Sequence, residues 1–205
     1  MRNLFNDDHQ AFRESFASFI QKEITPDYLQ WEKDGIVPRE LWLKAGAAGL
    51  LCCTVPEAYG GTQLDAETEV QTFAIIAEEI ARGDSGLADK LVQNWKVSVL
   101  LRNLAPAHIQ QRWFPRLMED PSFLLAHCLT EPRGASDRWL PYNVPEAAMQ
   151  TKAVLKDGKW VINGRKQFIS NGYDAGLYVV YANTRPGTGM LQGTSSFVVP
   201  RDTPG

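Results

Sequence analysis

The residues best able to do chemistry lie in one stretch, 124–137, which reads LLAHCLTEPRGASD. It begins as a short apolar run, typical of a buried strand, and stops abruptly at Thr130-Glu131-Pro132. Gly134 and Ala135 then precede Ser136. Because small residues let another molecule approach the backbone, and loop N–H groups favour an anionic oxygen, this stretch suits a binding site. An ordinary strand-to-loop transition stays open from the spacing alone.

Composition limits the function classes. With 205 residues, 44% hydrophobic and 22% charged, the chain suits one large or two modest soluble domains. A net charge of −3 argues against nucleic acid or an anionic membrane as the main partner. The longest weakly polar run, 45–55, is too short to span a bilayer. No signal-peptide pattern opens the sequence, so we expect a cytoplasmic protein.

The cysteines and histidines predict neither a disulfide nor a metal site. The adjacent Cys52 and Cys53 rarely pair with each other, and Cys128 stands alone, so free thiols in a reducing compartment are expected. The three histidines, His9, His108 and His127, have no ligand spacing.

Residues 1–121 have a helical apolar period. It predicts a helix capped by Asp7 or Asp8 and restarted or bent near Pro26, then helices over 38–50, about 66–82, 87–99 and 106–121. The expected buried residues of the third helix are Phe73, Ala77, Ile80 and Ala81. Five helices with short connections predict an antiparallel bundle.

Residues 122–205 predict short strands over 122–129, 149–155, 160–162, 165–170, 177–183 and 195–200. Asp157-Gly158 is a strong hairpin signal. The expected fold class is therefore α+β, with the helix bundle followed by a small antiparallel barrel or sandwich. A sheet ending at the final turn would expose an edge, so we expect an incomplete domain or a partner.

Several segments, in this order, resemble the acyl-CoA dehydrogenase family. They are TVPEAYGGT (54–62), AEEIARGDSG (77–86), CLTEPRGASD (128–137), WVINGRKQFISNG (160–172) and SSFVVPRDTPG (195–205). The resemblance covers nearly the whole chain. It implies an FAD enzyme that oxidises an acyl-CoA thioester to the trans-2-enoyl-CoA: a carboxylate removes the α-proton while the β-hydrogen leaves as hydride to the flavin. It also implies an electron-transfer flavoprotein as acceptor and a homo- or hetero-oligomer.

The resemblance assigns the candidate cofactor residues. They are His127, Cys128, Leu129, Thr130, Ser136, Phe168, Ile169 and Ser170. The backbone of Leu129 and Thr130, with the Thr130 hydroxyl, would contact the polar edge of the flavin. Ser136 would bind the pyrophosphate and approach the pantetheine of the substrate; a turn with Asp137 is the alternative.

Three further residues have alternative interpretations. Phe168 would stack beside the flavin or serve as a core aromatic. Asn94 is a candidate substrate contact, but a polar group in helix packing explains it better. Glu131 is a carboxylate near the site, but its place in the motif is structural, so we do not assign it as the base.

The chain departs from the family pattern at three places. Arg133 adds a charge, and Ala135 replaces a glycine, which would strain a left-handed backbone by roughly 1 kcal/mol. Residues 138–150 are extra, and either shape acyl binding or elaborate the surface. Nothing corresponds to the C-terminal helical bundle that carries the family's base, so this chain alone is expected to lack the base and bind FAD weakly.

Two other hypotheses are a flavin monooxygenase or nitroalkane-oxidase-like member of the same fold, and a non-catalytic subunit that pairs with a complete homologue. The acyl chain of the substrate is not indicated by any residue.

Overall fold

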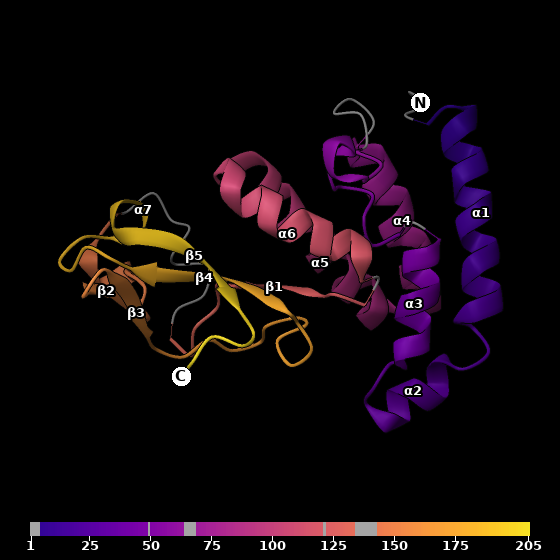
Figure 1. Ribbon diagram of the computed structural model, residues 1–205. Helices are drawn as coiled ribbons and strands as arrows, with labels where there is room; N and C mark the ends of the chain where they lie inside the picture. The colour runs from indigo at the N-terminus through magenta and orange to yellow at the C-terminus, as the bar shows by residue number, and fades with distance from the viewer. Residues whose placement is uncertain (1–4, 49, 64–68, 121, 134–142) are drawn as a thin grey trace. The chain divides into compact units, whose positions relative to one another are not determined.

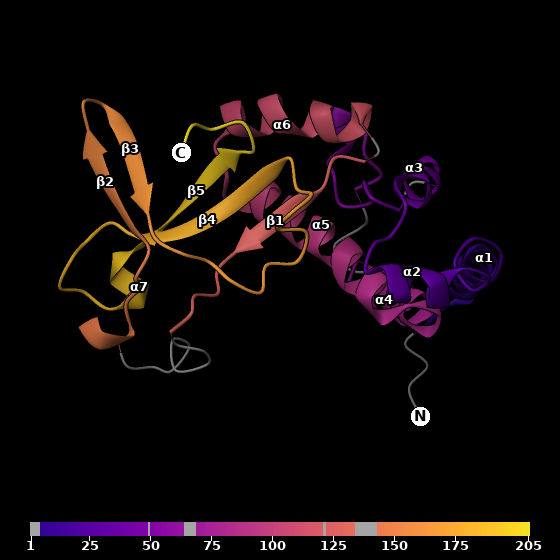
Figure 2. The same cartoon turned by 90° about the horizontal axis from the view of Figure 1, so that it is seen from below.

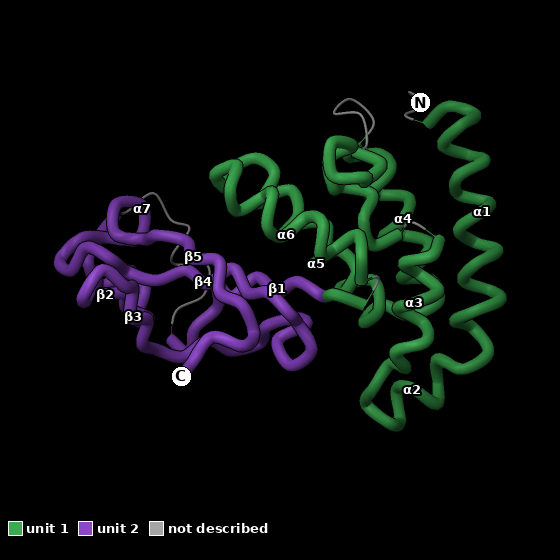
Figure 3. Tube along the Cα trace, in the orientation of Figure 1, with its two compact units in different colours: residues 1–123 green, residues 124–205 purple. Residues whose placement is uncertain are grey.

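The chain forms two compact units, residues 1–123 and 124–205 (Figure 3). They are seen in a computed structural model that describes residues 5–48, 50–63, 69–120, 122–133 and 143–205. The predicted domain boundary lies after residue 121.

The first unit is helical (Figure 1). Its elements are α1 (Asp7–Glu23), α2 (Tyr28–Asp34), α3 (Arg39–Ala47), the 3-10 turn η1 (Glu57–Tyr59), α4 (Glu69–Gly83), α5 (Ser85–Leu104) and α6 (Ala107–Glu119). The structure thus has one helix more than the five predicted, because the chain restarts after Pro26 as a separate helix. Gly35 ends that helix in a left-handed conformation, with φ 67°.

Side chains define where two of these helices begin. Asn6, not Asp7 or Asp8, caps α1: its Oδ1 accepts from the His9 backbone N at 2.9 Å, and its own backbone N donates to His9 Nδ1 at 3.2 Å. The predicted aspartate cap is therefore wrong, although both aspartates lie in the first turn, where the helix dipole favours negative charge. Asp84 caps α5 by accepting from the Leu87 N at 2.9 Å.

Trp95 lies at the centre of the helical core. It is 2% exposed, its ring stacks on Phe73 at 5.4 Å, and its Nε1 donates to the Leu50 carbonyl oxygen at 2.6 Å. One side chain therefore joins α5, α4 and the segment after α3. The indole N–H is satisfied in an otherwise apolar environment, as a buried tryptophan requires.

The buried face of α4 differs from the predicted one. Its buried residues are Thr72, Ile75, Ile76, Glu79 and Ile80, whereas Ala81 is exposed. Because α4 packs against both α1 and α5, its buried arc is wider than one stripe. Glu79 lies within that arc and pairs with Arg13 of α1 and Arg82.

The second unit is a five-stranded sheet with two short helical segments. Its elements are β1 (Leu125–Cys128), η3 (Pro145–Ala147), β2 (Lys152–Lys156), β3 (Lys159–Asn163), β4 (Leu177–Asn183), α7 (Met190–Gly193) and β5 (Thr194–Pro200). Strand β4 pairs with β1 on one side and β5 on the other. The β2–β3 hairpin joins β4 through one residue pair, Lys152 with Asn183, and is set apart in Figure 2.

The α+β class is confirmed, but the sheet is mixed rather than antiparallel. Strand β1 runs parallel to β4, and so does β2 at its single paired residue. A parallel pairing needs a long connection, and residues 129–176 supply it between β1 and β4. The Asp157-Gly158 hairpin is also confirmed: both residues have positive φ, 49° and 73°.

No helix of the described residues is long and apolar enough to cross a membrane.

Replacing Trp95 by Ala should destabilise the first unit by about 3–5 kcal/mol, because it leaves a cavity and removes the stacked ring. W95F keeps a six-membered aromatic ring and should cost about 1–3 kcal/mol, because it loses the hydrogen bond to the buried Leu50 carbonyl oxygen. Urea unfolding followed by far-UV circular dichroism measures both. Leu104→Ala, at a 74% exposed position on the same helix, is the control. Equal losses for W95A and L104A would contradict this account of the core.

Candidate functional site

The end of β1 lies beside residues 165–171. The Gln167 backbone N donates to the Thr130 carbonyl oxygen at 3.1 Å, and its side-chain Nε2 donates to that of Glu131 at 3.3 Å. Further along, Asn171 Nδ2 donates to the Leu125 carbonyl oxygen at 3.0 Å. The structure therefore brings together two of the motifs that the sequence separates by about 40 residues.

The predicted strand over 165–170 is wrong. The segment runs along β1 without joining the sheet ladder, because Phe168 and Asn171 have φ of 55° and 62°. Two left-handed residues interrupt the extended backbone that a ladder requires. The segment is instead held to β1 by the individual hydrogen bonds of Gln167 and Asn171.

An apolar cluster lies between β1 and the segment that carries Ile169. Ala126, Cys128 and Ala175 form a buried cluster, against which Ile169, Tyr178 and Val180 pack. A pocket of about 390 Å³ lies here, lined by Cys128, Lys166, Gln167, Phe168, Ile169, Gly172, Tyr173 and Tyr178. Three predicted site residues, Cys128, Phe168 and Ile169, thus share one pocket.

Phe168 is the most unusual residue of the pocket. Its side chain is 86% exposed, and its backbone is left-handed. A bulky residue rarely adopts this conformation, which costs about 1–2 kcal/mol. The interpretation of Phe168 as a core aromatic is therefore wrong. The ring is exposed to solvent and not buried, although the backbone that carries it is strained.

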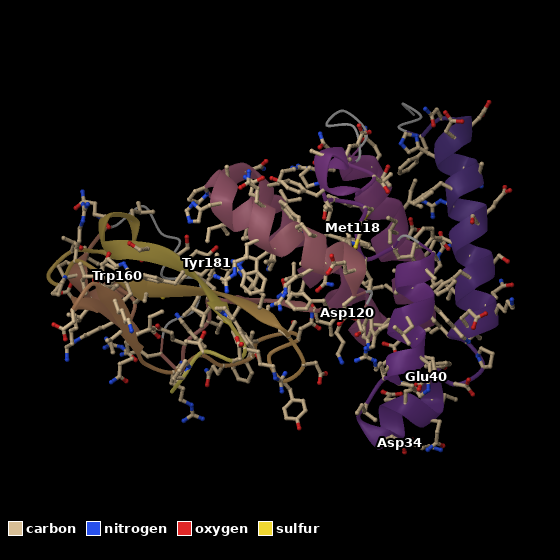
Figure 4. All side chains as sticks on the ribbon, in the orientation of Figure 1. Asp34, Glu40, Met118, Asp120, Trp160 and Tyr181 are labelled. Carbon is tan, nitrogen blue, oxygen red and sulfur yellow. The ribbon has the colours of Figure 1, made fainter. Side chains whose placement is uncertain are left out.

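His127 points to the opposite face of β1 from Cys128, since side chains alternate along a strand. Its Nε2 lies 3.0 Å from the Tyr181 hydroxyl on β4, and the two rings meet edge to face at 5.0 Å. Tyr181 is labelled in Figure 4, and burial raises the pKa of its hydroxyl. Any contact of His127 with the Cys128 side of the strand is therefore through its backbone.

The remaining candidate site residues differ in their exposure to solvent. Leu129 is half-buried and Thr130 is exposed at the strand end, while Ser170 is half-buried between the two left-handed residues. Ser136 lies outside the described residues, as do positions 134–142 of the connecting segment. In the first unit, Asn94 is 1% exposed, and its Nδ2 donates to the Phe123 carbonyl oxygen at 3.5 Å.

Glu131 is the most tightly bound side chain near the pocket. It is 1% exposed, and its carboxylate accepts from the backbone N of Gln150 at 2.7 Å and of Thr151 at 2.8 Å. Lys166 Nζ adds an ion pair at 2.9 Å. Burial alone would raise the pKa of Glu131, but the hydrogen bonds from Thr151, Gln150 and Lys166 outweigh it and lower the pKa to about 2.

Lys166 is a lining residue of the pocket that the sequence did not indicate. Its ammonium group pairs with Glu131, which lies 35 positions away in the sequence. The available signal was weak: a lysine two residues before an aromatic, in a segment expected to be a strand. A partner at that separation is visible only in the folded chain.

The environment of the Cys128 thiol in the pocket favours its protonated form. Burial raises the pKa of Cys128 to about 11, although the charge of Lys166 acts in the opposite direction. All three cysteines are free, and among the described residues no group of His, Cys, Asp and Glu side chains could hold a metal ion.

The fold and the site define a two-unit α+β protein with a pocket beside the end of strand β1. Two family models match it: the acyl-CoA dehydrogenase N-terminal domain over residues 6–120, and the acyl-CoA dehydrogenase middle domain over residues 126–205. The chain belongs to the acyl-CoA dehydrogenase family.

The chain is similar to curated and solved relatives along its whole length. It is 33% identical to the cyclohex-1-ene-1-carbonyl-CoA dehydrogenase of Syntrophus aciditrophicus, over 99% of this chain and 46% of that one. It is 32% identical to the pig mitochondrial long-chain specific acyl-CoA dehydrogenase, over 97% and 44%. An acyl-CoA dehydrogenase of Geobacillus kaustophilus superposes with a TM-score of 0.84 at 34% identity, over 100% and 51%.

Two further solved structures have flavins in their names. A glutaryl-CoA dehydrogenase of Mycobacterium smegmatis in complex with FADH2 has a TM-score of 0.80 at 25% identity, over 98% of this chain and 47% of that one. An FAD complex of PigA has a TM-score of 0.82 at 26% identity, over 100% and 51%. The chain thus spans about half the length of the relatives it matches.

The stability of the second unit should fall as the pH drops from about 4.5 to about 2. The lowered pKa of Glu131 means that its contribution is fully present above its ordinary value of 4.5 and is lost as the pH falls through about 2. The difference corresponds to about 3 kcal/mol. Hydrogen exchange of the β4 amides, measured across this range, reports on the second unit alone.

Glu131→Gln should flatten this pH dependence, because the variant has no carboxyl group to protonate. Glu146→Gln, which removes an exposed carboxyl in η3, is the matched control and should keep the wild-type slope. The assignment fails if E131Q and the wild type show the same slope.

Proposed function

We propose that this chain is the flavin-binding part of an enzyme that oxidises an acyl-CoA thioester to the trans-2-enoyl-CoA. The observation that carries the proposal is Phe168, an exposed aromatic ring on a left-handed backbone beside the strand end Leu129–Thr130. Strain of this kind clusters where a protein positions a ligand. Family membership supplies the reaction class.

The pocket suits the flat ring system of FAD. Aromatic rings of Phe168, Tyr173 and Tyr178 and the apolar Ile169 line it, which matches a planar, partly apolar group. The exposed Thr130 offers a hydroxyl at its margin. When bound, the flavin accepts a hydride from the substrate. The protein residues hold and orient the ring, and Leu129 and Thr130 provide backbone groups at its polar edge.

Glu131 is not proposed as the base, despite its place in the motif. Its carboxylate already accepts from Gln150, Thr151 and Lys166. A carboxylate with a pKa of about 2 is a poor proton acceptor at neutral pH. We therefore propose that the base comes from outside this chain, in a region that corresponds to the unmatched half of the relatives. Electron-transfer flavoprotein as acceptor, an oligomeric state and a cytoplasmic location belong to the same proposal.

One finding favours an alternative chemistry on this fold. PigA, a neighbour of comparable TM-score, is described in complex with FAD and, in a second structure, with FAD and proline. A flavin enzyme acting on a substrate other than an acyl-CoA therefore stays the second candidate, because a fold by itself does not decide a reaction.

Replacing Phe168 should separate FAD binding from stability. Phe168→Gly relieves the left-handed strain and should stabilise the chain by up to about 1 kcal/mol. The same change removes the ring and should weaken FAD binding roughly tenfold. Flavin fluorescence titration and thermal unfolding of the same samples measure the two effects.

Trp160→Ala is the control, because it removes a half-exposed aromatic ring from the β2–β3 hairpin. FAD affinity should not change in that variant. Unchanged FAD affinity in F168G, or an equal loss in W160A, would contradict the assignment of the pocket.

The reaction class is tested by fusing residues 1–205 to the unmatched half of the Geobacillus kaustophilus relative. We expect the fusion to bind FAD more tightly than the chain alone, and acyl-CoA to bleach its flavin absorbance under anaerobic conditions. Bleaching by a nitroalkane and not by acyl-CoA would instead support the alternative.

A further inference from the structure

Lys166 lines the pocket and also contacts residues outside its lining. Its side chain is 11% exposed. The ammonium group donates to the Leu129 carbonyl oxygen at 3.1 Å and to Glu131 Oε1 at 2.9 Å, and lies 3.4 Å from Met149 Sδ. Since an ammonium group has three donors and no acceptor, these contacts account for its geometry.

These contacts join the segments that carry the candidate flavin contacts. Leu129 and Thr130 end the strand, and Phe168 follows Lys166 by two residues. The neighbouring Gln167 N bonds the Thr130 carbonyl oxygen. The hydrogen bonds of Lys166 to Leu129 and of Gln167 to Thr130 therefore hold the backbone next to Phe168 at a fixed distance from the end of β1.

Glu131 extends the connection to a third segment. Its carboxylate holds the backbone N–H groups of Gln150 and Thr151 while pairing with Lys166. A buried ion pair is weak evidence for stability, because well-packed apolar residues often serve equally well. Its better-attested use is to select one arrangement of the chain, since a buried charge tolerates only the position in which it is paired.

We propose that Lys166 is a positioning residue for the flavin, which acts through Leu129, Glu131 and Phe168. The proposal rests on the proposed function, because it concerns FAD in this pocket. It predicts that the shape of the pocket, and not only its stability, depends on the ammonium group.

Three variants of the full chain test it: Lys166→Arg, Lys166→Met, and the double variant Lys166→Met with Glu131→Gln. Arginine keeps a cationic donor and should retain FAD binding within about threefold. K166M removes the Lys166 ammonium group from the buried Glu131 carboxylate and should lower both the thermal midpoint and FAD affinity, the latter roughly tenfold.

The double variant separates position from stability. Removing both charges should recover much of the thermal midpoint, because no unpaired carboxylate stays buried. FAD affinity should remain low. In K166M and in the double variant, the visible absorbance of the bound flavin should be shifted from that of the wild type, and the Gln167 amide should exchange faster than in the wild type. Lys44→Met, which breaks the Lys44–Glu23 ion pair in the first unit, is the matched control and should leave FAD affinity unchanged.

The outcomes distinguish the two proposals. A wild-type chain that binds no FAD would overturn the proposed function and this inference with it. A wild-type chain that binds FAD, with K166M or the double variant binding equally well and Gln167 equally protected, would overturn the inference alone. Recovery of FAD affinity in step with the thermal midpoint of the double variant would also overturn it, since the role would then be stability.

Discussion

The buried ion pair between Glu131 and Lys166 is the interaction that connects the segments around the pocket. It joins the end of β1 to residues 149–151 and to the segment that carries Phe168. The end of β1 and the segment that carries Phe168 do not pair in the sheet at this point, and residues 149–151 contact β4 through the Thr151 carbonyl oxygen, which accepts from the Asn183 N at 2.8 Å. Desolvating two charges is expensive, so the pair forms only where every remaining hydrogen-bonding group finds a partner. That requirement makes the arrangement specific, which an apolar contact would not do so strictly.

Two residues with left-handed backbones follow Lys166 closely in the chain. Phe168 and Asn171 adopt left-handed backbones within four residues of each other. Asn171 tolerates that conformation well, and its side chain is tied to the Leu125 carbonyl oxygen. Phe168 does not, and it persists because its neighbours are anchored on both sides, at Lys166 and at Asn171. The hydrogen bonds of Lys166 and Asn171 therefore hold the backbone of Phe168 in a strained conformation.

Local patterns predicted the fold where neighbouring residues decide the structure. The helical apolar period predicted a helix over 87–99, which lies within α5, and Asp157-Gly158 predicted the hairpin. The same reasoning failed where distant partners intervene. The wide buried face of α4 results from two packed neighbours, and the parallel β1–β4 pairing joins strands about 50 residues apart. No local period records either of them.

The sequence by itself determined the family, the α+β class, and the two motifs from which the pocket is built, because these are properties of residue type and order. It also assigned Glu131 a structural place from its motif. Only the tertiary structure decided that Phe168 is presented rather than buried, that His127 turns away to Tyr181, and that Lys166 neutralises Glu131. The physical reason is that each of these depends on a partner brought close by folding. Burial and pairing are set by what surrounds a residue in space, and a linear pattern does not contain that information.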